Sequence, residues 1–240
     1  MERKVRVAPP PAAQGFTLLE LAVVVVVVTI LLGSILVPLN TQVQQRNASQ
    51  TQRVLEETRD ALIGYAMIHG RLPRPASSAT DGTERATLCS TDADCTGFVP
   101  WAALGTAQAD AWGKLYRYSV TPALTVKGGF ALNTPGDKTV RSRNGAGTPI
   151  WLVRSSPVPA VIFSQGANNF GTTRDGLTLA SASQTNLDEA DNQNNDGTRP
   201  FWARTASSST SSPGGDFDDQ VVWIPTSLLF ARMVQAGQLP

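Results

Sequence analysis

Oxygen-bearing side chains gather between residues 186 and 219, where they could bind a cation. In the start of a calcium loop, alternate side-chain oxygens converge on a hard cation, and this spacing is matched by Asp188, Asp191, Asn192, Asn194 and Asp196 with Gly197. The glutamate that an EF-hand requires six residues after its glycine is replaced by Ala203. An alternative source of oxygens is the group Asp216, Asp218 and Asp219. Solvated turns of Asn and Asp explain the same pattern, so calcium is a hypothesis here.

Few other residues offer catalytic chemistry. The single histidine argues against a His-rich metal site and against most histidine-based catalysis. It is His69, at the end of a predicted helix, which favours a capping or packing role over a ligand role. The chain contains neither G-x-S-x-G nor H-E-x-x-H, and the segment NTPGDKT at 133–139 lacks the first glycine of a P-loop. We therefore predict no catalytic residues and no enzyme activity.

The two cysteines, Cys89 and Cys95, are too few for a four-thiolate site. Their spacing also differs from the C-x-x-C pattern of redox proteins. We predict a structural disulfide that closes a small polar loop, which requires an oxidising compartment. A catalytic thiol pair is the alternative.

Composition limits the partners and the class. The chain has 240 residues with 20 Lys and Arg against 19 Asp and Glu, so its net charge of +1 gives no electrostatic reason to expect nucleic acid. With 41% hydrophobic and 16% charged residues, it is not a disordered chain. The length fits one domain plus an appendage.

The appendage is an apolar run over residues 16–39, in which Glu20 is the one charged residue. This length is enough for a helix to cross a bilayer. Basic residues precede the run, and none follows before Arg46, so we expect the N-terminus in the cytoplasm and the remainder across the membrane. A secretory signal peptide or a simple signal anchor is the alternative, but the run is longer than a signal-peptide apolar region.

The start of this run holds a buried charge that needs a partner. A carboxylate such as Glu20 is costly inside a membrane helix, although less so near its end. If the chain were cut between Gly15 and Phe16, the new amine on Phe16 would be a cationic partner at a similar depth. That amine could belong to the same chain or to a neighbouring one.

The segment GFTLLELAVVVVVVTILL resembles the signal of type IV prepilins and of the pseudopilins of type II secretion. The resemblance covers about 25 residues. It implies cleavage between Gly15 and Phe16 by a prepilin peptidase and N-methylation of Phe16. It also implies that Glu20 pairs with the N-terminal amine of an adjacent subunit during filament assembly.

Two further segments are similar to the major pseudopilin of type II secretion. Residues 110–118, DAWGKLYRY, resemble the segment DPWG-x-x-Y-x-Y, with Ala111 in place of the proline. With or without the family resemblance, we expect this segment to form a turn followed by a strand and to have a structural role. Residues 164–168, SQGAN, resemble the loop S-x-G-A-D-G, with Asn168 and Asn169 in place of the aspartate and the glycine. In that family the loop region binds calcium.

The elements predicted from periodicity form an α+β protein. Apolar residues at helical spacing from Val54 to His69 predict an amphipathic helix that ends at Gly70. Strands are predicted at 115–120, 129–133, 149–154, 158–163 and 220–224, and a short packing helix or a partner-facing one follows, ended by Gly237. We expect a type IV pilin-like fold, in which a long N-terminal helix packs on an antiparallel sheet with long polar loops. The expected regions are a leader at 1–15, a transmembrane or filament-core helix at 16–39, an amphipathic helix at 40–70 and a periplasmic domain at 71–240.

The resemblance implies a structural subunit of a type IV pilus-like or type II pseudopilus filament. Its implied partners are prepilin peptidase, other subunits, an inner-membrane assembly platform and, before assembly, membrane lipid. It implies a single-pass protein of the bacterial inner membrane that later enters the filament. Nucleic acid would be a partner only for a minor pilin of a DNA-uptake system. The alternative function is a signal-anchored periplasmic binding or enzymatic domain that does not polymerise.

Overall fold

The computed structural model describes residues 15–128, 131–168, 170–179 and 185–239, without the side chains of residues 32–39. It consists of two compact units, Met1–Gln45 and Arg46–Pro240. The helix α1 (Leu18–His69) contributes residues to both. Apart from Gly15, the predicted leader lies outside the described residues.

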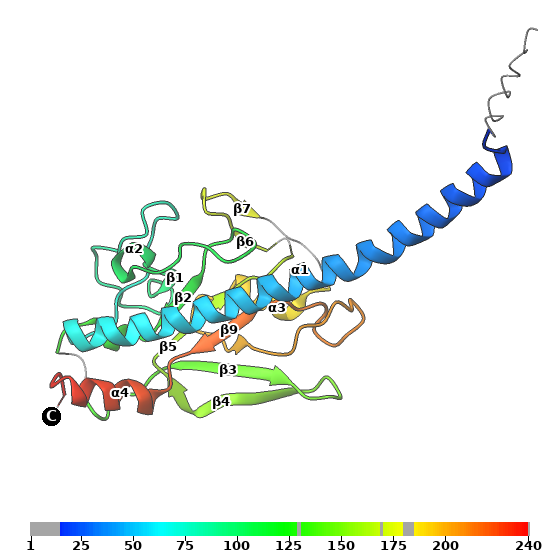
Figure 1. Cartoon of the computed structure of the whole chain (residues 1–240). Helices are drawn as coiled ribbons and strands as arrows, with labels where there is room; N and C mark the ends of the chain where they lie inside the picture. Colours follow the sequence, from blue (N-terminus) through cyan, green and yellow to red (C-terminus); the bar gives the residue numbers. More distant parts are fainter. Residues whose placement is uncertain (1–14, 129–130, 169, 180–184, 240) are drawn as a thin grey trace, which may run out of the picture. The chain divides into compact units, whose positions relative to one another are not determined.

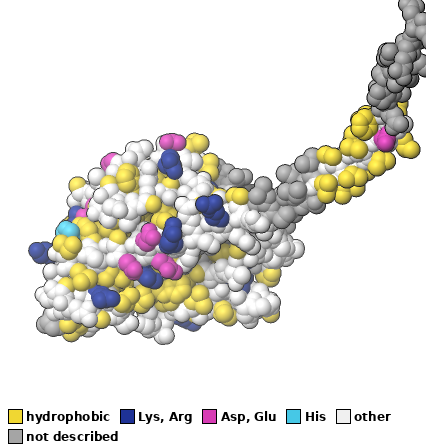
Figure 2. All heavy atoms as spheres, in the orientation of Figure 1, with side chains coloured by type: hydrophobic (Ala, Val, Ile, Leu, Met, Phe, Trp, Pro, Cys, Tyr) yellow, Lys and Arg dark blue, Asp and Glu magenta, His cyan; other side chains and the backbone are white. Residues whose placement is uncertain are grey.

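The described part of the first unit is the beginning of α1. Its side chains are exposed up to Leu31, and Figure 2 shows them as a largely apolar surface. No helix among the described residues has the length and apolar character needed to cross a membrane. The side chains of residues 32–39, which complete the predicted membrane segment, lie outside the described residues.

In the second unit, α1 is amphipathic and buries one face. The buried side chains recur every three or four residues, as helical geometry requires for a single stripe: Thr51, Leu55, Thr58, Leu62 and Ala66. The helix ends at His69, and Gly70 follows with a φ of 69°, the left-handed conformation that glycine adopts most readily. The ring of His69 stacks on that of Tyr65, so the packing role expected for this histidine is confirmed.

This face of α1 packs on a four-stranded antiparallel sheet. The strand order is β1 (Thr96–Phe98), β2 (Arg117–Val120), β5 (Ala160–Ser164) and β9 (Gln220–Trp223). Tyr118, Ile162 and Val222 are register partners across three of these strands and belong to the same core as the α1 stripe. Figure 1 shows α1 crossing this sheet.

The opposite face of β5 contributes to a second, smaller core. Val161 and Phe163 alternate with the residues that face α1, and they pack against the three-stranded sheet β4–β3–β8. In that sheet β3 (Lys138–Arg143) is antiparallel to β4 (Pro149–Val158) and parallel to β8 (Phe201–Trp202).

The remaining elements are short. They are α2 (Trp101–Leu104), the 3-10 helix η1 (Pro122–Thr125), β6 (Gly171–Thr172), β7 (Thr178–Leu179), α3 (Leu187–Gln193) and α4 (Thr226–Gln235). The helix α4 buries Leu229 and Met233 in the core that α1 covers, which confirms its predicted packing role.

The α+β class is confirmed, and the arrangement is compatible with a pilin-like fold. The predicted strands at 115–120, 149–154, 158–163 and 220–224 correspond to β2, β4, β5 and β9. The strand predicted at 129–133 is wrong at 131–133, which form a turn, and residues 129–130 lie outside the described residues. Cys89 and Cys95 form the predicted disulfide, with their Cα atoms 5.2 Å apart.

Candidate functional site

Two segments that are distant in sequence meet in a buried polar cluster. Asp110 closes a turn by accepting hydrogen bonds from the backbone N–H groups of Trp112 and Lys114, both at 2.9 Å. The other oxygen of Asp110 accepts a 2.6 Å hydrogen bond from the hydroxyl of Ser164 at the end of β5. The turn and the loop that follows β5, which the sequence analysis singled out separately, therefore form one site.

The loop after β5 is held by Asp218, which lies just before β9. Asp218 Oδ2 accepts hydrogen bonds from the backbone N–H groups of Ala167 and Asn168, at 2.9 and 3.0 Å. The same carboxyl group lies close to Gly166. A Cβ added to this glycine would lie 2.0 Å from Asp218 Oδ1. Glycine is required at this position because both the close approach and a φ of 60° exclude a side chain.

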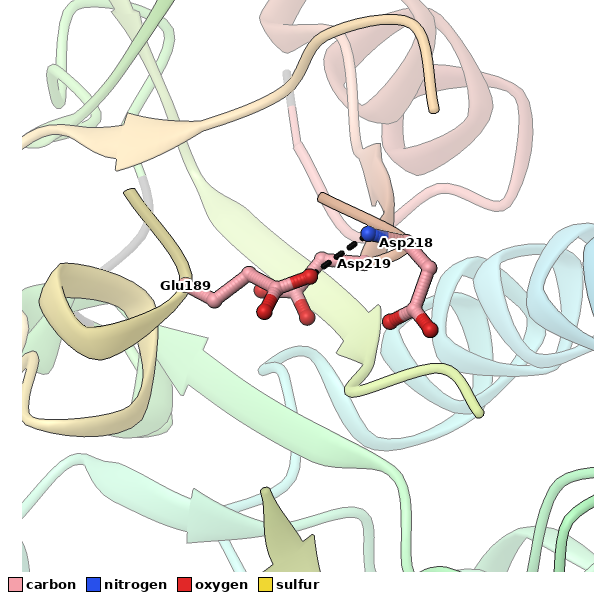
Figure 3. Close-up of side chains that lie close together, drawn as sticks. All are labelled: Glu189, Asp218 and Asp219. Carbon is pink, nitrogen blue, oxygen red and sulfur yellow. Dashed lines mark hydrogen bonds between the residues drawn. The ribbon is translucent and has the colours of Figure 1, made fainter. Parts of the chain in front are cut away.

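Two more carboxyl groups complete the acidic part of the cluster. One oxygen of Glu189 and one each of Asp218 and Asp219 lie within 4.8 Å of one another. Figure 3 shows Glu189 reaching from α3 towards the backbone of Asp218, whose N–H donates to Glu189 Oε1 at 2.6 Å. The other oxygen of Glu189 accepts from the side chains of Asn168 and Asn186. Asn192 donates to Asp219 at 2.7 Å.

Burial dominates the electrostatics of these acids. Removal from water raises the pKa of Glu189, Asp218 and Asp219, because a low-dielectric environment disfavours the charged form. Mutual repulsion among the three raises the pKa values of Glu189 and Asp219 further, while hydrogen bonds from the backbone and the asparagines act in the opposite direction.

A buried cation accompanies the acids. The side chain of Lys114 is only 4% exposed, and its ammonium donates to the backbone carbonyls of Gln165, at 3.3 Å, and of Asn168. Burial lowers the pKa of Lys114, and the charge of Asp218 is the strongest of the opposing influences. Among the described residues, no carboxylate oxygen lies within ion-pair distance of this ammonium.

Three of the six predicted calcium ligands point elsewhere. Asp188 is paired with Arg143 and Arg204, whose guanidinium nitrogens lie 2.7–2.9 Å from its oxygens. Asp191 is paired with Arg141 and Arg199, and Asp196 accepts hydrogen bonds from Thr198. The prediction that these aspartates converge is wrong, because separate arginines pair with Asp188 and Asp191, and Asp196 lies beyond the end of α3, where it is bonded to Thr198.

Asp218 and Asp219 are brought together as predicted, whereas Asp216 stays outside the group of three. The cluster as arranged does not fit a calcium ion, which takes six to eight oxygens. Only one oxygen each of Asp218 and Asp219 lacks a hydrogen-bond partner among the described residues of this cluster. The loop carbonyls that would complete the coordination already accept from Lys114.

The sequence analysis did not identify Glu189 and Lys114. A signal for Glu189 was present, since an asparagine followed three residues later by glutamate is a helix-start signature. It would have placed Glu189 in the first turn of a helix. Lys114 lies within the DAWGK segment, but nothing in that segment indicates that its ammonium crosses to the loop after β5.

The first helical turn of α1 is a second candidate site. The backbone N–H and the hydroxyl of Thr17 donate to Glu20 Oε2 at 3.1 and 3.0 Å, and the backbone N–H of Glu20 donates to the hydroxyl of Thr17 at 3.2 Å. These reciprocal bonds form a capping box, which satisfies backbone donors that the helix itself leaves free. Glu20 therefore has a partner in its own chain, Thr17, which directly follows Gly15 and Phe16.

Comparisons with known proteins bear on this N-terminal site. No curated protein and no solved structure matches the chain. Residues 11–36 match the model of the prokaryotic N-terminal methylation motif, and this range includes Gly15, Phe16 and Glu20. The chain therefore carries the prepilin-type signal of type IV pilins and pseudopilins.

Proposed function

We propose that this protein is a structural subunit of a type IV pilus-like or type II pseudopilus filament. Prepilin peptidase removes residues 1–15, and Phe16 becomes the methylated N-terminus. The protein waits in the inner membrane with its C-terminal domain in the periplasm, until an ATPase-driven machine extracts it into the filament through an assembly platform. The N-terminal methylation motif is the single observation that carries this proposal.

The exposed start of α1 supports assembly through this helix. Its apolar side chains, among them the six consecutive valines from Val23 to Val28, are exposed in the monomer. In the filament they exchange lipid for the helices of neighbouring subunits. Such an exchange adds little hydrophobic driving force, because lipid tails are as apolar as the side chains, so a directional contact has to set the register.

Glu20 supplies that directional contact. In the monomer its charge is compensated by the capping bonds from Thr17. Cleavage creates an ammonium on Phe16, and the amine of an adjacent subunit docks on Glu20. The attraction is strong because apolar surroundings screen it weakly.

The globular unit agrees with a periplasmic location. Its disulfide, Cys89–Cys95, is of the kind that forms and persists in an oxidising compartment. The DAWG segment favours a secretion pseudopilin. The long polar loops favour a minor subunit of a pilus or DNA-uptake system.

The first experiment examines processing in the native host. We expect mass spectrometry of the mature protein to find methylated Phe16 at the N-terminus, and Gly15→Ala to leave the full-length precursor on a gel. An intact Met1, or a cut beyond Leu39, would instead indicate a signal-anchored periplasmic domain that does not polymerise.

The second experiment separates charge pairing from helix capping. We expect Glu20→Ala to abolish assembly while leader cleavage continues. Thr17→Ala is the control, because it removes the two capping bonds that involve the threonine hydroxyl and keeps the carboxylate, and it should still assemble. Normal filaments from Glu20→Ala would contradict the pairing mechanism, and loss of filaments from both variants would assign the defect to the cap.

A further inference from the structure

The loop after β5 is held by opposite charges acting on its two kinds of backbone group. Asp218 accepts from the N–H groups of Ala167 and Asn168, and Lys114 donates to the carbonyls of Gln165 and Asn168. The backbone of one short loop thus links the half-buried carboxyl group of Asp218 to the buried ammonium of Lys114. Hydrogen bonds from Lys114 and to Asp218 therefore hold this loop together.

The ammonium of Lys114 uses the loop carbonyls that a bound metal would need beside the three carboxyl groups. Backbone carbonyls and carboxylates are the groups that bind hard cations, and here both kinds border one buried cluster. The charge of this cluster is not balanced by other side chains, since Glu189, Asp218 and Asp219 have no arginine or lysine within ion-pair distance among the described residues. The neighbouring aspartates of α3, by contrast, are each paired with two arginines.

We propose that Lys114 is a built-in cation that replaces a divalent metal ion in the cluster of Glu189, Asp218 and Asp219. Its ammonium donates hydrogen bonds to the loop carbonyls, so the loop folds without a metal ion and binds none. Removal of the ammonium frees those carbonyls next to three carboxylates. A calcium site then forms from the loop carbonyls together with Asp218, Asp219 and Glu189.

The test compares the full-length processed protein in detergent micelles with its Lys114 variants, in calcium and in EGTA. The wild-type protein should unfold at the same temperature in both and release no heat on calorimetric titration with calcium. Lys114→Met should unfold at a lower temperature in EGTA and recover about 5–10 °C in saturating calcium. Lys114→Arg, which keeps the positive charge, should remain insensitive to calcium.

A second variant tests which oxygens calcium uses. Adding Asp218→Asn to Lys114→Met should remove the response to calcium, since the cluster then loses the carboxylate nearest the loop. Three results would overturn the proposal: stabilisation of the wild-type protein by calcium, a destabilised Lys114→Met that calcium does not rescue, or a Lys114→Met that fails to fold even when produced in calcium. The last result counts because calcium should substitute for the missing ammonium.

Discussion

At the scale of single residues, Glu84 shows how a side chain in a loop fixes the end of a helix. It accepts hydrogen bonds from Tyr65 in α1, at 2.8 Å, from Arg71, at 2.9 Å, and from the backbone N–H of Arg74, also at 2.9 Å. Burial alone would raise the pKa of Glu84, but the hydrogen bonds from Arg71, Arg74 and Tyr65 lower it to about 2.

This geometry predicts an acid-dependent contribution to stability. The pKa of Glu84 is about 2 in the folded protein against 4.5 for an ordinary glutamate. The stabilisation is therefore fully present above pH 4.5 and is lost as the pH falls towards 2. We expect Glu84→Gln to lower the free energy of unfolding by about 1–2 kcal/mol at neutral pH, allowing for partial solvent screening. Denaturant unfolding at several pH values measures the difference, which should vanish in acid.

The matched control for Glu84 is an exposed glutamate. Glu57 pairs with Arg53 at 3.7 Å, and both side chains are more than half exposed. Exposed pairs of this kind contribute little, so Glu57→Gln should leave the free energy of unfolding nearly unchanged at any pH. If Glu84→Gln behaved like Glu57→Gln, the buried network would not stabilise the folded protein.

At the scale of elements, strong periodicity was predictive and short polar segments were not. The stripe from Val54 to His69 correctly predicted the amphipathic part of α1 and its end at Gly70. The strands β1 and β3, with sequences TGF and KTVRSR, have no apolar alternation to reveal them. Their pairing depends on partner strands, which a single segment does not encode. In α3, the run of Asp and Asn favoured a loop over a seven-residue helix.

The packing of α1 gives a prediction at this scale. Leu62 is completely buried against the four-stranded sheet, whereas Ile68, in the next turns of the same helix, is 74% exposed. We expect Leu62→Ala to lower the free energy of unfolding by about 2–5 kcal/mol, because it leaves a cavity in a close-packed core. Ile68→Ala is the control on the same helix and should cost less than about 0.5 kcal/mol. Thermal or denaturant unfolding distinguishes the two variants. Equal effects would contradict the assignment of Leu62 to the buried face of α1 and of Ile68 to the exposed one.

At the scale of the whole molecule, the N-terminal site was predictable and the acidic cluster was not. The residues around Gly15, Phe16 and Glu20 form one continuous motif, so their spacing alone carries the information. The cluster draws on the turn after Asp110, the loop after Ser164, the helix α3 and the segment just before β9. Side chains from such distant segments meet only after the sheet has formed, which is why the predicted set of aspartates was partly wrong.

The separation into two units predicts that residues 46–240 fold on their own. Both apolar cores, the disulfide and all three sheets lie within this range. A unit with its own core is expected to unfold cooperatively without the remainder of the chain. We expect the fragment to be monomeric without detergent by size-exclusion chromatography and to give a single unfolding transition by circular dichroism. The control is the chain without residues 1–15, which exposes Val23 to Val28 and should require detergent. A fragment that aggregates, or that melts without a cooperative transition, would show that the first 45 residues are needed for the fold.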